Sequence, residues 1–118
     1  MNIGHARRKI TPQGDIYLIG YRNLPNRLEP ATGVHDDVFA NAILFQQGER
    51  EVCLFNADVL EFEESMAEEV KTMLAERYGI DRDCVLLSAT HDHTSIVAYH
   101  RSWWTGKFDE NYYRWFLD

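Results

Sequence analysis

Cysteine is scarce in this sequence. There are two cysteines in 118 residues, too few for the disulfide framework that holds many small secreted domains together. Cys53 and Cys84 each lie in an apolar, strand-like run. Buried free cysteines behave as small apolar residues. We therefore predict two reduced, buried thiols in place of a disulfide.

Long apolar runs are absent as well. No stretch approaches the roughly 20 apolar residues that a membrane-spanning helix requires. Residues 1–9 carry positive charges, but no apolar core follows them as it would in a signal peptide. The sequence predicts no membrane span, and we expect a cytoplasmic protein.

The sequence is also poor in positively charged residues. Twelve Lys and Arg stand against nineteen Asp and Glu, which gives a formal net charge of −7. Nucleic-acid phosphates need a basic face, and so does a polybasic membrane anchor. Both kinds of partner are therefore excluded. The composition is otherwise that of a globular protein, and the length suits one domain over residues 1–118.

Two strands joined by a hairpin are predicted in the middle of the chain. Residues 38–45 and 51–57 are apolar at nearly every position, and residues 46–50 between them contain Gly48. A short connection with glycine is typical of a β-hairpin. Because the apolar residues do not alternate with polar ones, we expect both faces of these strands to be covered.

A helix and a further strand follow the hairpin. Apolar side chains recur at spacings of three and four over residues 61–78, which predicts a helix, and Gly79 is a suitable C-cap. The acidic residues at its start are expected to form a solvated face. Residues 84–90 read as the next strand, so that 51–57 and 84–90 should pair in parallel through a βαβ unit. The fold class is therefore α/β, a mixed sheet with a βαβ unit and flanking helices.

The two ends of the chain carry weaker signals. Residues 2–11 show little apolar periodicity, residues 16–19 are expected to form a short strand before Gly20, and residues 20–34 an irregular loop. Near the other end, Asp109 is a suitable cap for a helix over residues 110–117. Trp103 and Trp104 between these elements either line a pocket or serve packing.

The clearest chemical signal follows the strand at residues 84–90. His91 and His93 are one residue apart, and in an extended backbone residues i and i+2 point to the same side. Imidazole is the commonest metal ligand, and open sheets present ligand sites at the carboxyl ends of their strands. The pair is therefore a candidate metal site, with a hydrogen-bonded histidine pair as the alternative.

The remaining members of such a site are not selected by spacing. A catalytic zinc needs three protein ligands and one open position. Asp92 would point away from the pair, and none of the other histidines (His5, His35 and His100) is favoured by its spacing. Asp58, at the end of the strand over residues 51–57, either orients an imidazole or is an N-cap or solvated acid.

Motifs in order along residues 4–100 resemble the neutral/alkaline (non-lysosomal) ceramidases, at the start of their N-terminal catalytic domain. Residues 9–12 and 19–21 are similar to that family's "ITP" and "GY" segments. Residues 31–36 and 55–58 are similar to its "tGiH" and "slD" segments, and residues 87–94 to its "lSgTHTHS" motif. The last of these motifs is the most specific.

The resemblance implies a zinc-dependent amidase that cleaves the amide bond of an N-acyl sphingoid base or a related N-acyl lipid. It implies that His91 is a zinc ligand, that His93 is a catalytic residue that hydrogen-bonds the substrate, and that Gly20 borders the substrate. Residues 94–97 depart from the family's glycine-rich sequence, and Asn41 replaces its usual Arg. β-Branched residues in place of glycine would reshape the pocket.

The family's catalytic domain is several times longer than this chain, and its other zinc ligands and its serine would lie further along. We therefore expect an N-terminal portion of such a domain, inactive alone, that pairs with a complementing chain or forms a homo-oligomer. One alternative is a non-catalytic, self-associating α/β domain. Another is a metallo-β-lactamase-like hydrolase, whose motif continues with Asp-His where this chain has Ser95 and Ile96.

Overall fold

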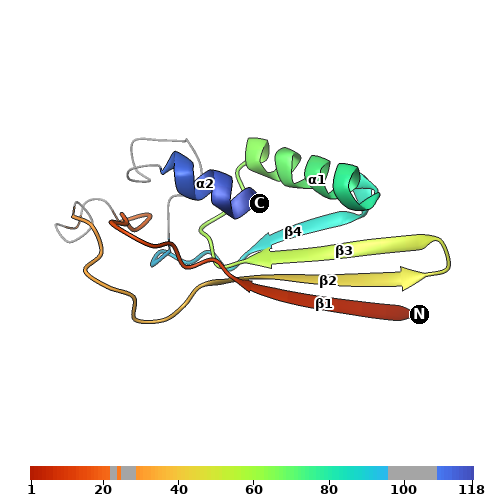
Figure 1. The fold of residues 1–118 in the computed structure, drawn as a ribbon, viewed down its shortest axis with the longest axis horizontal. Helices are drawn as coiled ribbons and strands as arrows, with labels where there is room; N and C mark the ends of the chain where they lie inside the picture. Colours follow the sequence, from red (N-terminus) through yellow and green to blue (C-terminus); the bar gives the residue numbers. More distant parts are fainter. Residues whose placement is uncertain (22–23, 25–28, 96–108) are drawn as a thin grey trace.

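A mixed β-sheet with two α-helices on one face forms the part of the chain described by the computed structural model, residues 1–21, 24, 29–95 and 109–118 (Figure 1). The elements run β1 (Asn2–Lys9), β2 (Phe39–Gln47), β3 (Arg50–Ala57), α1 (Glu64–Tyr78), a 3₁₀ turn (Arg82–Cys84), β4 (Val85–Ala89) and α2 (Glu110–Leu117). The predicted α/β class is confirmed.

The strands lie in the order β1-β2-β3-β4. β1 and β3 both pair antiparallel with β2, whereas β4 pairs parallel with β3, so that Ala57 lies beside Ala89. Gly48 has φ +62° in the turn between β2 and β3, a left-handed conformation that glycine adopts without strain. The predicted hairpin and the predicted βαβ unit are both confirmed.

Helix α1 begins three residues later than its apolar pattern predicts and ends where predicted. The side chain of Glu63 accepts a hydrogen bond from the Ser65 N–H, which caps the first turn. Gly79 closes the helix with φ +72°, and its N–H donates to the Ala75 carbonyl.

The acidic residues at the start of α1 are largely exposed, as predicted, and two of them also bond to neighbouring elements. Glu68 pairs with Arg82 from the following 3₁₀ turn, and Glu69 accepts a hydrogen bond from the Tyr113 hydroxyl at 2.7 Å. Burial, followed by the carboxylate of Glu69, raises the pKa of Tyr113. These acids therefore connect α1 to its neighbours.

The first strand is the main element that the sequence did not reveal. β1 is exposed along its whole length, so it has no buried face to impose an alternation of apolar and polar residues. It forms because its backbone pairs with β2 over residues 2–9. The short strand expected at residues 16–19 is also wrong, since Leu18 alone makes an isolated bridge there.

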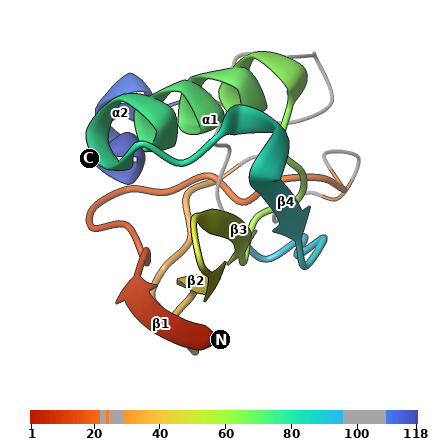
Figure 2. The ribbon, with the colours of Figure 1, turned by 90° about the vertical axis from the view of Figure 1, so that its right-hand side faces the viewer.

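The helices cover one face of the sheet (Figure 2). On the other face, Ile3, Val52 and Leu86 are 60%, 44% and 62% exposed. The prediction that both faces of the middle strands are covered is therefore wrong. The apolar residues of β2 and β3 do not alternate because one set packs under the helices while the other set forms an apolar outer face.

Two buried clusters hold the helices to the sheet. The larger contains Met66 of α1, Tyr112 of α2, and Ile10, Ala40, Ala57 and Val59; the smaller contains Cys53, Ile80 and Val85. Cys53 and Cys84 are free thiols, as predicted, but only Cys53 is buried, because Cys84 lies half-buried in the 3₁₀ turn before β4. Burial raises the pKa of the Cys53 thiol. Among the described residues, no helix is long and apolar enough to cross a membrane.

Helix α2 is held by its own cap and by a buried hydroxyl. Asp109 accepts hydrogen bonds from the N–H groups of Asn111 and Tyr112, which confirms the predicted cap. The Tyr112 hydroxyl donates to the Ile10 carbonyl at 2.7 Å, and burial raises the pKa of this phenol. An eight-residue helix is marginal in isolation, so this attachment stabilises it.

Replacing Tyr112 with Phe should lower the free energy of unfolding by about 1–2 kcal/mol, because the buried Ile10 carbonyl loses its hydrogen-bond donor. Urea denaturation of the variant and the wild type measures this difference. Tyr113→Phe is the matched control: its bond to Glu69 is exposed, so the loss should be smaller. Equal losses for the two variants would contradict a specific role for the buried bond.

Candidate functional site

His91 and His93, the two histidines that the sequence indicates as a site, lie where the chain leaves the carboxyl end of β4. Backbone pairing continues past the end of the strand: the Thr90 N–H donates to the Ala57 carbonyl at 3.1 Å, and the Asp92 N–H donates to the Val59 carbonyl at 3.3 Å. His91 lies between these two bonds. The segment after β3 therefore supports the segment after β4, which fixes the backbone of His91.

His91 is oriented by its neighbour across this ladder. Its Nδ1 lies 2.9 Å from the Leu60 carbonyl oxygen. A carbonyl oxygen only accepts, so Nδ1 carries the hydrogen and Nε2 of the neutral ring keeps its lone pair. Metal-binding histidines are typically held in this way through their second nitrogen. The backbone of His91 has φ +62°, which is uncommon for a residue with a side chain.

His93 lies beside His91, although not for the predicted reason. The ring centroids are 5.1 Å apart and the ring planes are perpendicular. The backbone is not extended: residues 93–94 form a turn in which Asp92 Oδ1 accepts from the Thr94 N–H and hydroxyl at 2.7 and 2.6 Å. Asp92 therefore shapes the turn that brings the two imidazoles together.

Residues 19–21 form the other wall around His93. The Ile19 N–H donates to the Ser95 carbonyl at 3.0 Å, and the Tyr21 ring lies 4.4 Å from the His93 ring. A Cβ atom at Gly20, whose φ is +72°, would come within 2.2 Å of the buried His93 Nδ1. Gly20 therefore permits the close approach of this loop to the imidazole. Its predicted contact with substrate stays a prediction.

The other candidates lie elsewhere or have other roles. Asp58 Oδ2 accepts from the Phe39 N–H at 2.8 Å, so this carboxylate closes the ladder between β2 and β3 and is not the helix cap. His35 is exposed and lies 2.7 Å from Asp36, and His5 is exposed on β1. His100, Trp103 and Trp104 lie outside the described residues.

Within the described ranges, no three His, Cys, Asp or Glu side chains form a group able to hold a metal ion. His91 fits the role of one zinc ligand, through Nε2. A catalytic zinc requires three protein ligands, and the described residues do not bring three together.

Comparison with known proteins finds similarity in fold. No protein-family model matches the sequence. The neutral ceramidase from Pseudomonas aeruginosa matches 81% of this chain with a TM-score of 0.68 and 21% sequence identity, and a structure described as ceramidase complexed with C2 gives the same values. The chain spans 16% and 15% of the length of these two proteins. It therefore has the fold of a small part of neutral ceramidase.

The His91 tautomer can be observed directly. We expect long-range ¹H–¹⁵N NMR correlations to show the hydrogen on Nδ1 of the neutral His91 ring, because the Leu60 carbonyl accepts it. His5, which is exposed on β1, provides an internal reference. A His91 ring with its hydrogen on Nε2 would contradict the proposed orientation.

Substituting Ala for Gly20 should displace His93. The left-handed backbone alone costs about 1–2 kcal/mol for a residue with a side chain, and the clash with Nδ1 should add about 1–3 kcal/mol of overpacking. Gly48→Ala is the matched control, since Gly48 has φ +62° but a Cβ atom there would meet nothing within 4 Å. Urea denaturation measures both losses, and equal losses would show that Gly20 does not constrain the imidazole.

Proposed function

We propose that this chain forms part of the catalytic centre of a zinc-dependent hydrolase of the ceramidase type. The proposed reaction is hydrolysis of the amide bond of an N-acyl sphingoid base or a related N-acyl lipid. The observation that carries the proposal is the bond between His91 Nδ1 and the Leu60 carbonyl, in a fold similar to part of neutral ceramidase. That bond leaves Nε2 available to a metal.

His91 would bind zinc through Nε2, held by its neighbours on two sides. The Leu60 carbonyl sets the tautomer, and the backbone bonds at Thr90 and Asp92 hold the segment on either side of the residue. A zinc ion bound there would activate a water molecule and polarise the amide carbonyl. Because the ring is oriented before a metal arrives, little conformational freedom is lost when Nε2 binds.

His93 would act on the substrate. Its ring lies between those of Tyr21 and His91, at centroid distances of 4.4 and 5.1 Å. An imidazole held this close to a zinc ligand is suited to hydrogen-bond a substrate group and to exchange a proton with it. Gly20 would keep this ring in place, and residues 94 and 95 would alter the pocket relative to a glycine-rich loop.

The proposal requires additional polypeptide. His91 supplies one of the three protein ligands that a catalytic zinc needs, and the described residues contain no further cluster of suitable side chains. We therefore propose that the remaining ligands come from residues outside the described part or from a complementing chain, and that residues 1–118 alone do not hydrolyse the substrate.

A second candidate function is self-association without catalysis. The observation that favours it is the apolar outer face of the sheet, where Ile3, Phe45 and Val52 lie opposite one another on three strands. Exposed apolar surface of this kind marks interaction sites in many soluble proteins. Sedimentation measurements on the chain at several concentrations distinguish this candidate from the first.

The metal role of His91 is tested by zinc titration. We expect Zn²⁺ to shift the imidazole signals of His91 before those of His5 and His35 in NMR spectra, with weak affinity because one ligand is provided. His91→Ala should remove this effect, whereas His35→Ala, which changes an exposed imidazole far along the chain, should not. Preferential binding at His35 in the wild type would contradict the assignment.

Activity is tested where a complete site is available. A chimera in which this chain replaces the matched segment of the Pseudomonas aeruginosa neutral ceramidase should hydrolyse a fluorogenic N-acyl sphingosine. His91→Ala in the chimera should lower the rate at least about 100-fold, as expected for loss of a metal ligand, while His35→Ala leaves it nearly unchanged. Hydrolysis by residues 1–118 alone would contradict the proposal that the chain is incomplete.

A further inference from the structure

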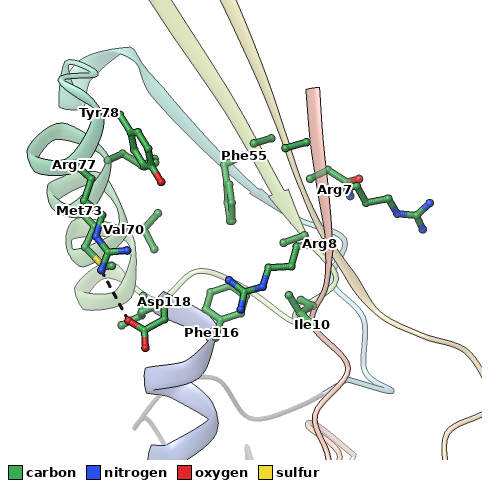
Figure 3. Close-up of a pocket in the computed structure, with 16 residues that line it drawn as sticks. Arg7, Arg8, Ile10, Phe55, Val70, Met73, Arg77, Tyr78, Phe116 and Asp118 are labelled. Atoms are coloured by element: carbon green, nitrogen blue, oxygen red, sulfur yellow. Dashed lines mark ion pairs between the residues drawn. The ribbon is translucent and has the colours of Figure 1, made fainter. Parts of the chain in front are cut away.

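A cavity of about 240 Å³ lies between the helix-covered face of the sheet and the two helices (Figure 3). β1, β2 and β3 contribute its floor, and α1 and α2 contribute its roof and one end. The residues of the candidate metal site (Gly20, Tyr21, His91 and His93) do not line it. The cavity is therefore a separate feature, and its role is independent of the proposed amidase function.

The interior of this cavity is apolar. Its floor contains Ala40 and Ala42 of β2 and Phe55 of β3, while Val70 and Met73 of α1 lie opposite. Figure 3 shows Phe55, Val70 and Phe116 around the same space. The space exists because β2 presents alanines where larger side chains would reach the helices. An apolar chain placed against this lining would remove apolar surface from water, which favours its binding.

One rim of the cavity is cationic. Arg8 of β1 shares a face of the sheet with Ala40, its partner in register, and its side chain extends toward Phe116 (Figure 3). Arg7 also borders the cavity, but its side chain lies on the opposite face, with its guanidinium 3.6 Å from the centroid of the Phe39 ring. Alternation along the strand thus directs one of two adjacent arginines to the cavity.

The charge of Arg8 is not balanced within the described part of the chain. Its guanidinium lies 5.2 Å from the Trp115 ring centroid, and no carboxylate of the described residues forms an ion pair with it. Arg77, also on the lining, is paired with Asp118 at 3.8 Å. Arg8 is therefore the cation that remains available to an anionic group entering the cavity.

We propose that this cavity binds an aliphatic carboxylate, with the chain between Phe55 and Val70 and the carboxylate on Arg8. A guanidinium binds a carboxylate through two parallel N–H donors. A cavity of about 150 Å³ holds benzene, so in proportion this one holds a saturated chain of about eight to ten carbons. A polar ligand of the same size would lose its hydration without gaining partners from this lining.

Isothermal titration of the 118-residue chain with decanoate and with decanol tests the proposal. Decanoate should bind with 1:1 stoichiometry, and decanol, which has the chain but not the charge, should bind about tenfold more weakly. Arg8→Gln should weaken decanoate binding about tenfold and change decanol binding less than about twofold. Arg7→Gln is the matched control, because its side chain lies on the other face of the sheet, and both affinities should be retained.

NMR locates the ligand independently of any variant. Decanoate should shift the amide signals of Ala42 and Val70, which line the cavity, and leave that of Gly48 in the hairpin unchanged. Absence of decanoate binding up to about 1 mM would overturn the proposal. Equal weakening by Arg7→Gln and Arg8→Gln, or shifts confined to residues outside the cavity, would overturn it as well.

Discussion

Parallel pairing between β3 and β4 is the interaction on which the site depends. The two strands become neighbours because helix α1 crosses over the sheet between them, and their hydrogen bonds continue past both strand ends to Thr90 and Asp92. This extension holds His91 against the Leu60 carbonyl. Because the same ladder aligns the strands and fixes the imidazole, the geometry of the candidate metal ligand follows from the architecture of the sheet.

A second constraint is the close approach of two loops. Residues 19–21 and 91–95 are joined by the bond from Ile19 to Ser95, and the left-handed backbone at Gly20, Tyr21 and His91 lets the two loops meet around one imidazole. Residues with side chains adopt such conformations rarely, and they persist where surrounding structure compensates for the strain. Tyr21 and His91 both do so beside His93, which indicates that this region is built for a particular arrangement of rings.

The helices cover one face of the sheet and pack on it unevenly. Tyr112 and Met66 pack into the buried cluster near the end of β1, whereas the alanines of β2 leave a cavity beneath α1. The opposite face retains exposed apolar side chains. Both features follow from the same pattern in β2 and β3, whose residues are apolar on two faces although the helices cover one.

Local signals in the sequence were sufficient to predict much of this fold. Neighbouring residues alone determine several elements: the apolar period of α1, the glycines at positions 48 and 79, and the cap at Asp109. The βαβ connection then requires β3 and β4 to be parallel. The placement of His91 just beyond the end of a strand was evident for the same reason. Tertiary structure alone decided the rest. β1 forms by pairing with a strand whose residues lie 30 to 44 positions further along the chain. Asp58 closes a ladder instead of orienting an imidazole, and His93 meets His91 through a turn in place of an extended backbone. Each of these depends on a partner distant in the chain or on a turn between neighbouring residues. The periodicity of the sequence predicts neither.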